Sequence, residues 1–504
     1  MGQSAISRAA PTLGPAATLA VAHRPAATLA RAIAAARPAA LAFAAGAAVL
    51  AALAPPPAAA QYAMADRVDR IFADFAAYDR PGCAVAVSEE GRVTLERAYG
   101  MAELEHGVRN TPATVFEAGS VSKQFTAAAT ILLALDGKIS LEDDIRDYIP
   151  EVPDYGPTIT IRHLLNHTSG LRDWGSVASL EGWPRTSRVH THDHMLDIVS
   201  RQRALNYPPG ERYSYTNTGY NLQAVLVERV SGMPFAEFSQ RHIFDRLGLY
   251  NTEWRDDYTR LVPNRAQAYT RSRDGGWALN MPFENVHGNG GLLTTVGDLL
   301  RWTESLERAE LGERFVAEMH RTGVLNNGES ITYASGLVVG QYRGVPEISH
   351  SGSTAGYRAY LARYPEQRVG VAVLCNAANA SAGGLAHEVV ELWLGNALAP
   401  VARRDASQQG GQEEPPPRWE PTPAELGAFV GTYHSPEANA TYTVSVQDGE
   451  LMLQRPFRSP NALTPGREAD TFGSYRFIRD AAGRVIELSV SSSRVYDMRF
   501  ERVR

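Results

Sequence analysis

The chain has 504 residues, 44% of them hydrophobic, with 49 basic against 55 acidic residues and two cysteines. A chain of this length and hydrophobicity buries at least one large core, which excludes general disorder, and two cysteines exclude a small disulfide-stapled scaffold. The formal net charge of −6 excludes a nucleic-acid binder held by excess positive charge, so we expect no nucleic-acid partner.

Lysine is rare in this chain. Only Lys123 and Lys138 are lysines, and all other basic residues are arginines. A lysine amine can lose its proton in a suitable environment, whereas an arginine guanidinium cannot. Each lysine therefore has to be explained. Lys138 follows Gly137 at the end of a predicted helix, where a capping role is sufficient.

Residues 1–60 have the pattern of a secretory leader. Four arginines and no acidic residue precede an apolar run over residues 39–53, and three prolines and three alanines end the segment before Gln61. The run is shorter than the roughly 20 residues that a membrane-spanning helix needs. We expect a signal peptide, a periplasmic or secreted product and no transmembrane helix in the mature chain. A disordered alanine-rich leader or an upstream start codon is the alternative for residues 1–30.

Residues 61–401 mix predicted strands and helices. Short β-branched runs predict buried strands at Cys83–Val87 and Val369–Leu374. Apolar periodicity predicts helices over Val121–Leu135 and Met195–Arg203. This part of the chain therefore forms a mixed α and β domain.

The pattern changes twice near the C-terminus. Residues 402–421, rich in Gln, Gly, Glu and Pro, have almost nothing to bury and predict a linker. Residues 422–504 then alternate hydrophobic and polar side chains, as around Val444 and Leu488, with turns at Asp448-Gly449 and Gly483. We predict a small antiparallel barrel or sandwich there.

One motif joins a hydroxyl to one of the two lysines. Ser120 and Lys123 form an S-x-x-K sequence at the start of a predicted helix, one turn apart on the same face. A serine is a weak nucleophile until a base takes its proton, and a desolvated lysine can be that base. We predict Ser120 as nucleophile and Lys123 as base; a serine cap beside a solvated lysine is the alternative.

A second cluster contains Tyr215 and Asn217, which place a phenol and an amide on one side of a loop. A helix is predicted directly after them, over Leu222–Val230. An ordinary aromatic turn is the structural alternative.

A third cluster is His350-Ser351-Gly352-Ser353, between predicted strands at Pro346–Ser349 and Tyr357–Arg363. Gly352 would let a substrate approach the strand backbone, and the N–H group that follows can face a developing oxyanion. A hydrogen-bonded strand histidine is the alternative.

In the order S-x-x-K, Y-x-N, H-x-G, these motifs resemble those of the penicillin-recognising serine hydrolases. That clan includes penicillin-binding proteins, class C β-lactamases, D-Ala-D-Ala carboxypeptidases, D-aminopeptidases and β-lactamase-like esterases. The resemblance covers about residues 65–398, including segments 164–171 and 288–292 that look like framing loops. It implies an α+β fold of the β-lactamase/transpeptidase type, an antiparallel sheet flanked by helices plus a helical lobe, and a lipocalin-like β-barrel over residues 422–504.

The resemblance also implies roles. Ser120 is similar to the acylated nucleophile, and Lys123 and Tyr215 are similar to the pair that moves its proton and protonates the leaving group. Asn217 is similar to the amide that holds the substrate. No metal or organic cofactor is implied.

The third motif is similar to the substrate-binding strand of the clan. His350 matches a cation position, and the backbone N–H groups of Ser120 and Ser353 match the oxyanion hole. Because a histidine is only partly charged near neutral pH, its attraction to a substrate carboxylate would be weak. Arg358 or Arg172 could supply a fixed cation, although an ordinary surface arginine is the simpler interpretation of each.

The substrate class follows from the same motif. Dedicated β-lactamases more often carry K-T-G, whereas His350-Ser351-Gly352 resembles the carboxypeptidase, aminopeptidase and esterase branches. We expect a small-molecule or peptide substrate, D-amino-acid peptides or amides first, with small esters and β-lactams as alternatives. A non-catalytic binding or scaffold member of the fold is a second alternative, against which the intact motifs argue.

The segment His190-Thr191-His192-Asp193-His194 nearly matches the H-x-H-x-D-H pattern of metallo-hydrolases. The segment is one residue shorter than that pattern. An amphipathic helix follows it, for which Thr191 or Asp193 is a natural cap. We therefore expect a helix cap there and no metal site.

The resemblance further implies that the strand at residues 81–88 pairs with residues 369–376, which brings Cys83 near Cys375. Buried free thiols are our expectation, because a chain of this length can fold without a disulfide. A bridge is the alternative, which a Cα separation well beyond about 7 Å would exclude.

Overall fold

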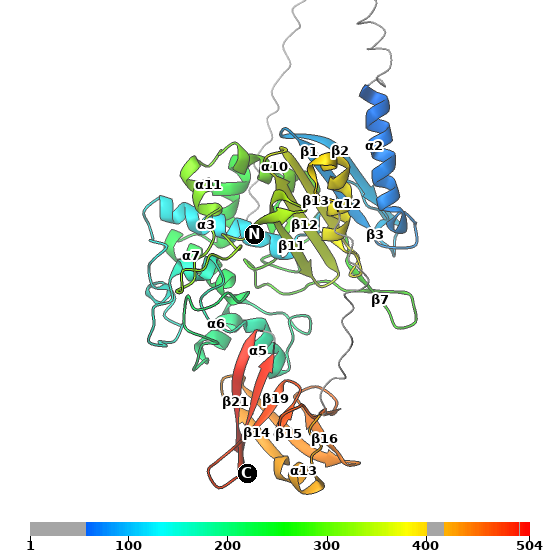
Figure 1. The fold of residues 1–504 in the computed structure, drawn as a ribbon. Coiled ribbons are helices and arrows are strands. Elements are labelled where there is room, and N and C mark those ends of the chain that lie inside the picture. Colours follow the sequence, from blue (N-terminus) through cyan, green and yellow to red (C-terminus); the bar gives the residue numbers. More distant parts are fainter. Residues whose placement is uncertain (1–56, 401–417, 493, 504) are drawn as a thin grey trace, which may run out of the picture. The chain divides into compact units, whose positions relative to one another are not determined.

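The computed structural model describes residues 57–400, 418–492 and 494–503 (Figure 1). Most of the predicted leader and of the predicted linker lies outside these ranges. Among the helices described, none combines the length and the apolar character that crossing a bilayer requires.

The first domain is built on an antiparallel sheet of six strands in the order β10-β11-β12-β13-β1-β2 (Figure 1). The strands predicted at Cys83 and Val369 are confirmed, and they lie side by side within this sheet. The bounds are β1 Cys83–Glu89, β2 Arg92–Tyr99, β10 Val338–Tyr342, β11 Val345–Thr354, β12 Tyr357–Tyr364 and β13 Val369–Cys375.

Both faces of this sheet are covered. Successive side chains of a strand point to opposite faces, so each strand contributes to two hydrophobic clusters. On one face Val85 and Val373 pack with helices α2 (Pro57–Ile71) and α12 (Ala382–Leu394). On the other face Ala84 and Leu374 belong to a larger core that includes α3 (Lys123–Leu135) and α10 (Val296–Glu307). Sheet and helices thus enclose two hydrophobic layers.

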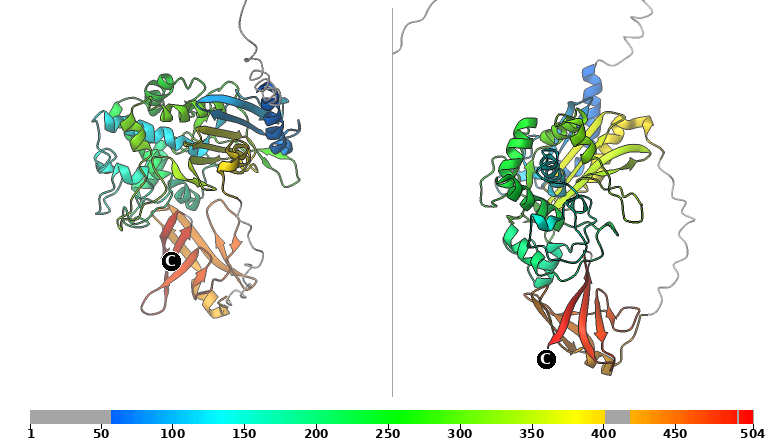
Figure 2. Two further views of the ribbon diagram at one scale, coloured as in Figure 1. Left: turned by 45° about the horizontal axis from the view of Figure 1, so that its top comes forward. Right: turned by 90° about the vertical axis from the view of Figure 1, so that its left-hand side faces the viewer.

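A helical lobe lies to one side of the sheet in both views of Figure 2. Its first long helix, α3, confirms the helix predicted over Val121–Leu135, with a 3₁₀ turn η2 (Gly119–Ser122) in front of it. The remaining helical segments of the first domain, in the lobe and elsewhere, are η1 Ala73–Phe75, η3 Ile145–Asp147, α4 Ile161–Leu165, α5 Trp174–Glu181, α6 His192–Ser200, α7 Thr218–Ser231, α8 Phe235–Ser239, a π-helical turn η4 Gln240–Phe244, α9 Asp245–Leu247, α11 Glu313–Met319 and η5 Gly395–Ala397.

The first domain also contains three small sheets. Strand β5, which precedes the S-x-x-K motif, pairs with β9, and β9 also pairs with β6. The small strands are β3 Met101–Glu103, β4 Val108–Arg109, β5 Phe116–Glu117, β6 Glu253–Trp254, β7 Tyr269–Arg271, β8 Trp277–Leu279 and β9 Leu292–Thr294.

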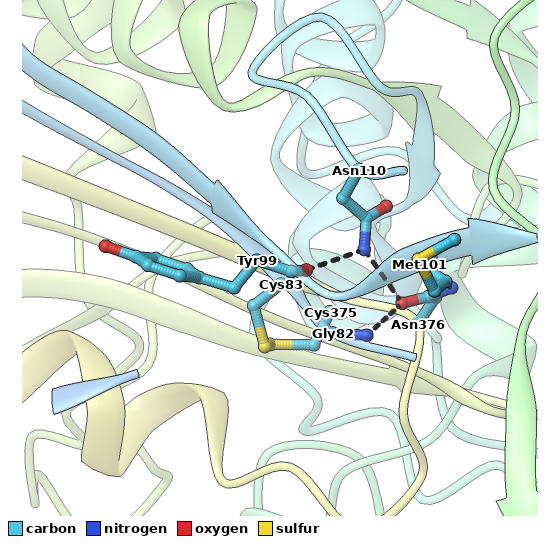
Figure 3. The surroundings of a disulfide bond; sticks show 7 residues. All are labelled: Gly82, Cys83, Tyr99, Met101, Asn110, Cys375 and Asn376. Atoms are coloured by element: carbon cyan, nitrogen blue, oxygen red, sulfur yellow. Dashed lines mark hydrogen bonds between the residues drawn. A yellow bond between two sulfur atoms is a disulfide. The ribbon is translucent and has the colours of Figure 1, made fainter. Parts of the chain in front are cut away.

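The two cysteines form a disulfide, so the expectation of free thiols was wrong (Figure 3). Cys83 of β1 and Cys375 of β13 are register partners, with their Cα atoms 4.0 Å apart. The neighbouring Asn376 is buried, and its side-chain oxygen accepts a hydrogen bond of 2.8 Å from the backbone N–H of Gly82. The bridge therefore joins the N-terminal and C-terminal strands of the sheet, which are distant in sequence.

The C-terminal domain is all-β, as predicted. Its eight strands form one antiparallel curled sheet, a half-barrel whose order β17-β16-β15-β14-β21-β20-β19-β18 leaves β17 and β18 as edges. Helix α13 (Pro423–Phe429) precedes it. The strands are β14 Gly431–Ser435, β15 Ala440–Gln447, β16 Glu450–Gln454, β17 Asn461–Ala462, β18 Thr471–Phe472, β19 Tyr475–Arg479, β20 Val485–Ser492 and β21 Val495–Val503.

A buried ion pair links this domain to the helical lobe. Arg172 is 5% exposed and donates from Nη1 to Oε2 of Glu437 at 2.6 Å. The same carboxylate oxygen accepts from the backbone N–H of Arg203 at 2.7 Å, and the phenol of Tyr442 donates to the carbonyl of Leu180 at 2.9 Å. Arg172 is therefore not the surface arginine that its sequence context suggested.

Candidate active site

Ser120 lies in the 3₁₀ turn η2, and Lys123 is the first residue of α3. In a 3₁₀ turn residues i and i+3 eclipse each other, so the turn places the hydroxyl directly beside the amine. Nζ of Lys123 lies 3.3 Å from Oγ of Ser120. The turn is held by the buried Ser122, whose hydroxyl donates to the carbonyl of Gly119 and accepts from the backbone N–H of Leu292.

The side chain of Lys123 is fully buried. Besides Ser120, its nitrogen contacts Oδ1 of Asn217 at 3.0 Å and the backbone carbonyl oxygen of Asn289 at 2.7 Å. Burial lowers the pKa of Lys123 well below its ordinary value, and the positive charges of Arg185 and Arg494 act in the same direction. A lysine in this environment can exist as the neutral amine.

Tyr215 comes from the loop before α7 and packs against the buried lysine. Nζ of Lys123 lies 4.8 Å from the centroid of the Tyr215 ring. Burial raises the pKa of Tyr215, which keeps its phenol protonated at neutral pH. The ring of His167 packs at a tilt against that of Tyr215, with 4.2 Å between centroids, and accepts from the backbone N–H of Thr216 at 3.2 Å, so it fixes the loop that carries Tyr215.

Asn217 is positioned from its backbone as well as from its side chain. Its backbone N–H donates to Oδ2 of Asp173 at 2.8 Å, and α7 begins directly after it. Asp173 in turn caps α5, since its Oδ1 accepts from the backbone N–H of Ser176 at 2.9 Å. Asp173 was not predicted, and as one aspartate at a helix start it gave no catalytic signal.

The third motif lies inside strand β11 and not after its end. The strand predicted over Pro346–Ser349 continues to Thr354, so His350, Gly352 and Ser353 are strand residues paired with β12.

His350 does not supply the cation that its motif position suggested. The ring is buried: Nε2 lies 3.0 Å from the phenol oxygen of Tyr333, and Nδ1 lies 2.6 Å from the carbonyl oxygen of Ser351. Burial lowers the pKa of His350 to about 4, and the charge of Lys123 adds to this effect. At neutral pH the imidazole is therefore uncharged.

Gly352 makes room for the protein backbone and not, as expected, for a substrate. A Cβ atom added at Gly352 would lie 2.0 Å from the carbonyl oxygen of Ala118. Gly119, with φ of +52°, is equally constrained, because its Cβ would lie 2.6 Å from the backbone nitrogen of Ser353. The two glycines allow the turn that carries Ser120 to press against β11, so that Ser120 and Ser353 come together.

A cavity of about 380 Å³ opens at Ser120. Of the predicted site residues, its wall contains Ser120, Tyr215, Asn217, His350 and Ser353. Lys123 is behind this wall, bonded to Ser120, and Gly352 is within the strand next to Ser353. The structure therefore brings together all seven residues that the three motifs nominated.

Two arginines that sequence reasoning missed also line this cavity, Arg185 and Arg494. Arg185 lies between α5 and α6, in the segment after Asp173, and forms a two-point ion pair with Glu284. Arg494 belongs to the C-terminal domain. In a chain whose basic residues are nearly all arginines, neither residue carried a recognisable signal.

The other sequence candidates are engaged elsewhere. Arg358 is half-buried and donates to the backbone carbonyls of Ala355 and Tyr357. In the segment from His190 to His194, Thr191 caps α6 as predicted, and the ring of His194 completes the capping box. The ring of His192 bonds to the backbone carbonyl of His287.

Comparisons with known proteins identify the family of this chain. The sequence model of the Beta-lactamase family matches residues 68–392. Penicillin-binding protein 4* of Bacillus subtilis (strain 168) is 31% identical over 316 residues, which span 58% of this chain and 67% of that protein. The D-aminopeptidase of Gluconobacter oxydans (strain 621H) is 28% identical over 304 residues, which span 60% of this chain but only 57% of that protein.

The fold has relatives among solved structures. The octameric penicillin-binding protein homologue from Pyrococcus abyssi aligns with a TM-score of 0.59 at 22% identity, over 87% of this chain and 98% of that one. The family match covers more than half of the sequence, and it includes all three motifs around the cavity. The chain therefore belongs to the Beta-lactamase family and is placed with its penicillin-recognising, β-lactamase-related hydrolases.

Proposed function

We propose that this protein is a serine hydrolase that works through an acyl-enzyme on Ser120. The environment of Lys123 carries the proposal. A neutral amine has two hydrogens to donate and one lone pair. Nζ of Lys123 has two neighbours that can only accept, Oδ1 of Asn217 and the carbonyl of Asn289, and one that can donate, the hydroxyl of Ser120. These three partners accommodate the ammonium and the neutral amine alike, and the burial that lowers the pKa of Lys123 favours the neutral amine, which accepts from the hydroxyl of Ser120.

The proposed reaction begins when Lys123 takes the proton of Ser120 and Oγ attacks the substrate carbonyl carbon. The backbone N–H groups of Ser120 and Ser353 stabilise the resulting oxyanion. The phenol of Tyr215 donates a proton to the leaving group and recovers one from Lys123, which leaves an acyl-Ser120 ester. Water then attacks this ester by the reverse proton route and releases the acid.

The proposed substrates are D-amino-acid peptides or amides. One relative is named a D-aminopeptidase, and the cavity of about 380 Å³ has room for a short peptide. A small ester or a β-lactam would use the same acyl-enzyme chemistry. Turnover of a D-Ala-D-Ala peptide, a nitrophenyl ester and a chromogenic cephalosporin, measured side by side, ranks the three classes.

We test the nucleophile by labelling with a fluorophosphonate and mapping the modified peptide. An adduct on Ser120 in the wild type, and none in Ser120→Ala, is the expected result. A folded wild-type protein without an adduct, or with one elsewhere, would remove the hydrolase proposal in favour of a non-catalytic binding member of the fold.

Export to the periplasm or the medium is part of the proposal. It is supported by the predicted leader over residues 1–60 and by the Cys83–Cys375 disulfide, since disulfides persist in oxidising compartments. Cell fractionation with the leader present and deleted tests this localisation; equal amounts in the cytoplasm in both cases would contradict it.

A further inference from the structure

The cavity at Ser120 has a strongly one-sided charge. Its ionisable wall residues with a permanent charge are Arg185 and Arg494, and no carboxylate is found among the described residues of that wall. His350 is neutral, as shown above, and Tyr215 keeps its proton. A bound group that carries negative charge would therefore be favoured there, and a free amine would be repelled.

Arg494 reaches the cavity from the C-terminal domain, at the tip of the hairpin between β20 and β21. Its guanidinium is over the face of Tyr215, with Cζ 4.9 Å from the ring centroid. The side chain remains 38% exposed, so some of its guanidinium N–H donors are accessible to a ligand. It is thus both close to the proposed proton-transfer residues and available.

The backbone, and not the side chain, anchors this hairpin tip to the hydrolase domain. The carbonyl of Arg494 accepts from the backbone N–H of Asp173 at 3.2 Å and from Nδ2 of Asn206 at 3.0 Å. Oδ1 of Asn206 accepts from the backbone N–H of Tyr496 at 2.8 Å. The guanidinium adds only its contact with the face of the Tyr215 ring and an approach of 3.8 Å to Oδ2 of Asp173.

The neighbouring carboxylates compensate the two arginines unequally, because Glu284 pairs closely with Arg185 whereas Asp173 only approaches Arg494. Asp173 is 3.8 Å from Nη1 of Arg494, but its oxygens also accept from the backbone N–H groups of Asn217 and Ser176. Glu284 binds Arg185 through two contacts and so fixes the direction of that guanidinium.

We infer that Arg494, assisted by Arg185, binds a carboxylate of the substrate and so makes this site selective for substrates with a free carboxylate beside the scissile bond. A guanidinium presents a planar pair of donors that matches a carboxylate. The selected class is therefore carboxypeptidase-type D-amino-acid peptides and not peptides recognised by a free amine. This inference rests on the proposed function, because it names the substrate of the same site.

The test compares D-Ala-D-Ala peptides that differ only at the C-terminus, as free carboxylate or as amide. We expect wild-type kcat/KM to be at least about tenfold higher for the carboxylate, the value of one charge-assisted hydrogen bond. In Arg494→Gln this ratio should fall towards one, and in Arg494→Lys, which keeps the charge but loses the fork, it should be intermediate.

The control is Arg499→Gln, on the same hairpin, where the side chain pairs with Glu487 and Asp497. It should keep the wild-type ratio. A wild-type preference for the amide, or a loss in Arg494→Gln that is equal for both peptides, would overturn the inference.

Two readouts separate this inference from the proposed function. Absence of a fluorophosphonate adduct on Ser120 rejects the hydrolase, whereas labelling without a carboxylate preference rejects only the role of Arg494. If neither peptide is cleaved, calorimetric binding of both peptides to Ser120→Ala decides. Tighter binding of the carboxylate, lost in the Ser120→Ala/Arg494→Gln double variant, supports the inference, and equal binding rejects it.

Discussion

The side-chain nitrogen of the fully buried Lys123 lies 3.3 Å from the hydroxyl oxygen of Ser120, which lines the cavity. This contact explains why one of two lysines in the chain occurs here. An arginine would remain protonated at every accessible pH, and it could not accept the proton of the serine.

Replacing this lysine should strongly slow acylation without removing the cavity. We expect Lys123→Met and Lys123→Arg to slow fluorophosphonate labelling of Ser120 by about 10²- to 10⁴-fold, the usual contribution of a general base. Labelling rates and thermal melting are measured together. Lys138→Arg, at the exposed second lysine, is the control and should label at the wild-type rate; equal labelling by a folded Lys123→Arg protein would contradict the assignment.

The pH dependence of the reaction should follow the lowered pKa of Lys123. Below that pKa the amine is protonated and cannot act as base, so kcat/KM should fall as the pH falls through it. Removing a positive neighbour raises the pKa of the amine. Arg494→Gln should therefore move this acidic limb to higher pH.

His350 provides the control for this pH profile. Its pKa is about 4, so its protonation contributes only at the acid end. In His350→Gln the acidic fall in kcat/KM should occur at the same pH as in the wild type. If the substitution admits water to Lys123, the pKa of the lysine rises and the fall moves to higher pH. A limb that disappears in His350→Gln would assign it to the histidine instead of the lysine.

The contact between the turn of Ser120 and strand β11 should not tolerate a methyl group. We expect Gly352→Ala to lower activity strongly and to destabilise the fold by about 1–3 kcal/mol, because the new Cβ would lie 2.0 Å from the carbonyl oxygen of Ala118. Gly340→Ala, in the same sheet, meets nothing within 4 Å and is the matched control. Denaturant unfolding and peptide turnover measure both effects; similar losses in the two variants would contradict this role of Gly352.

The disulfide should contribute to stability through the long loop that it closes. The Cys83→Ala/Cys375→Ala variant should lose roughly 2–5 kcal/mol of unfolding free energy. Reductant should lower the melting temperature of the wild type and leave that of the variant unchanged. A wild-type melting temperature that does not respond to reductant under unfolding conditions would show that the bridge is thermodynamically neutral.

Local sequence was sufficient for the residues of the three motifs. Ser120 and Lys123 are joined by one helical turn, so their spacing set their relative placement, whereas Tyr215, Asn217 and His350 were assigned through the resemblance to the clan. The central strands, α3 and the all-β C-terminal domain were predicted from the spacing of hydrophobic residues along the sequence. Chemistry that depends on near neighbours in the chain was therefore predictable.

Properties that depend on distant neighbours were not predictable. The neutral state of His350 results from burial next to Tyr333, and the bridge between Cys83 and Cys375 depends on the exact register of two strands. Arg494 reaches the cavity only through the docking of a second domain. No spacing in the sequence relates Arg494 to Ser120.

The buried pair of Arg172 and Glu437 has a consequence for folding cooperativity. Removing only the carboxylate of Glu437, with the C-terminal sheet in place, would leave the guanidinium of Arg172 buried against Met498 and Tyr496 without its partner. Loss of one partner of a buried pair costs about 3–5 kcal/mol. The appended sheet is thus a thermodynamic partner of the hydrolase domain, and the two should unfold in a single calorimetric transition.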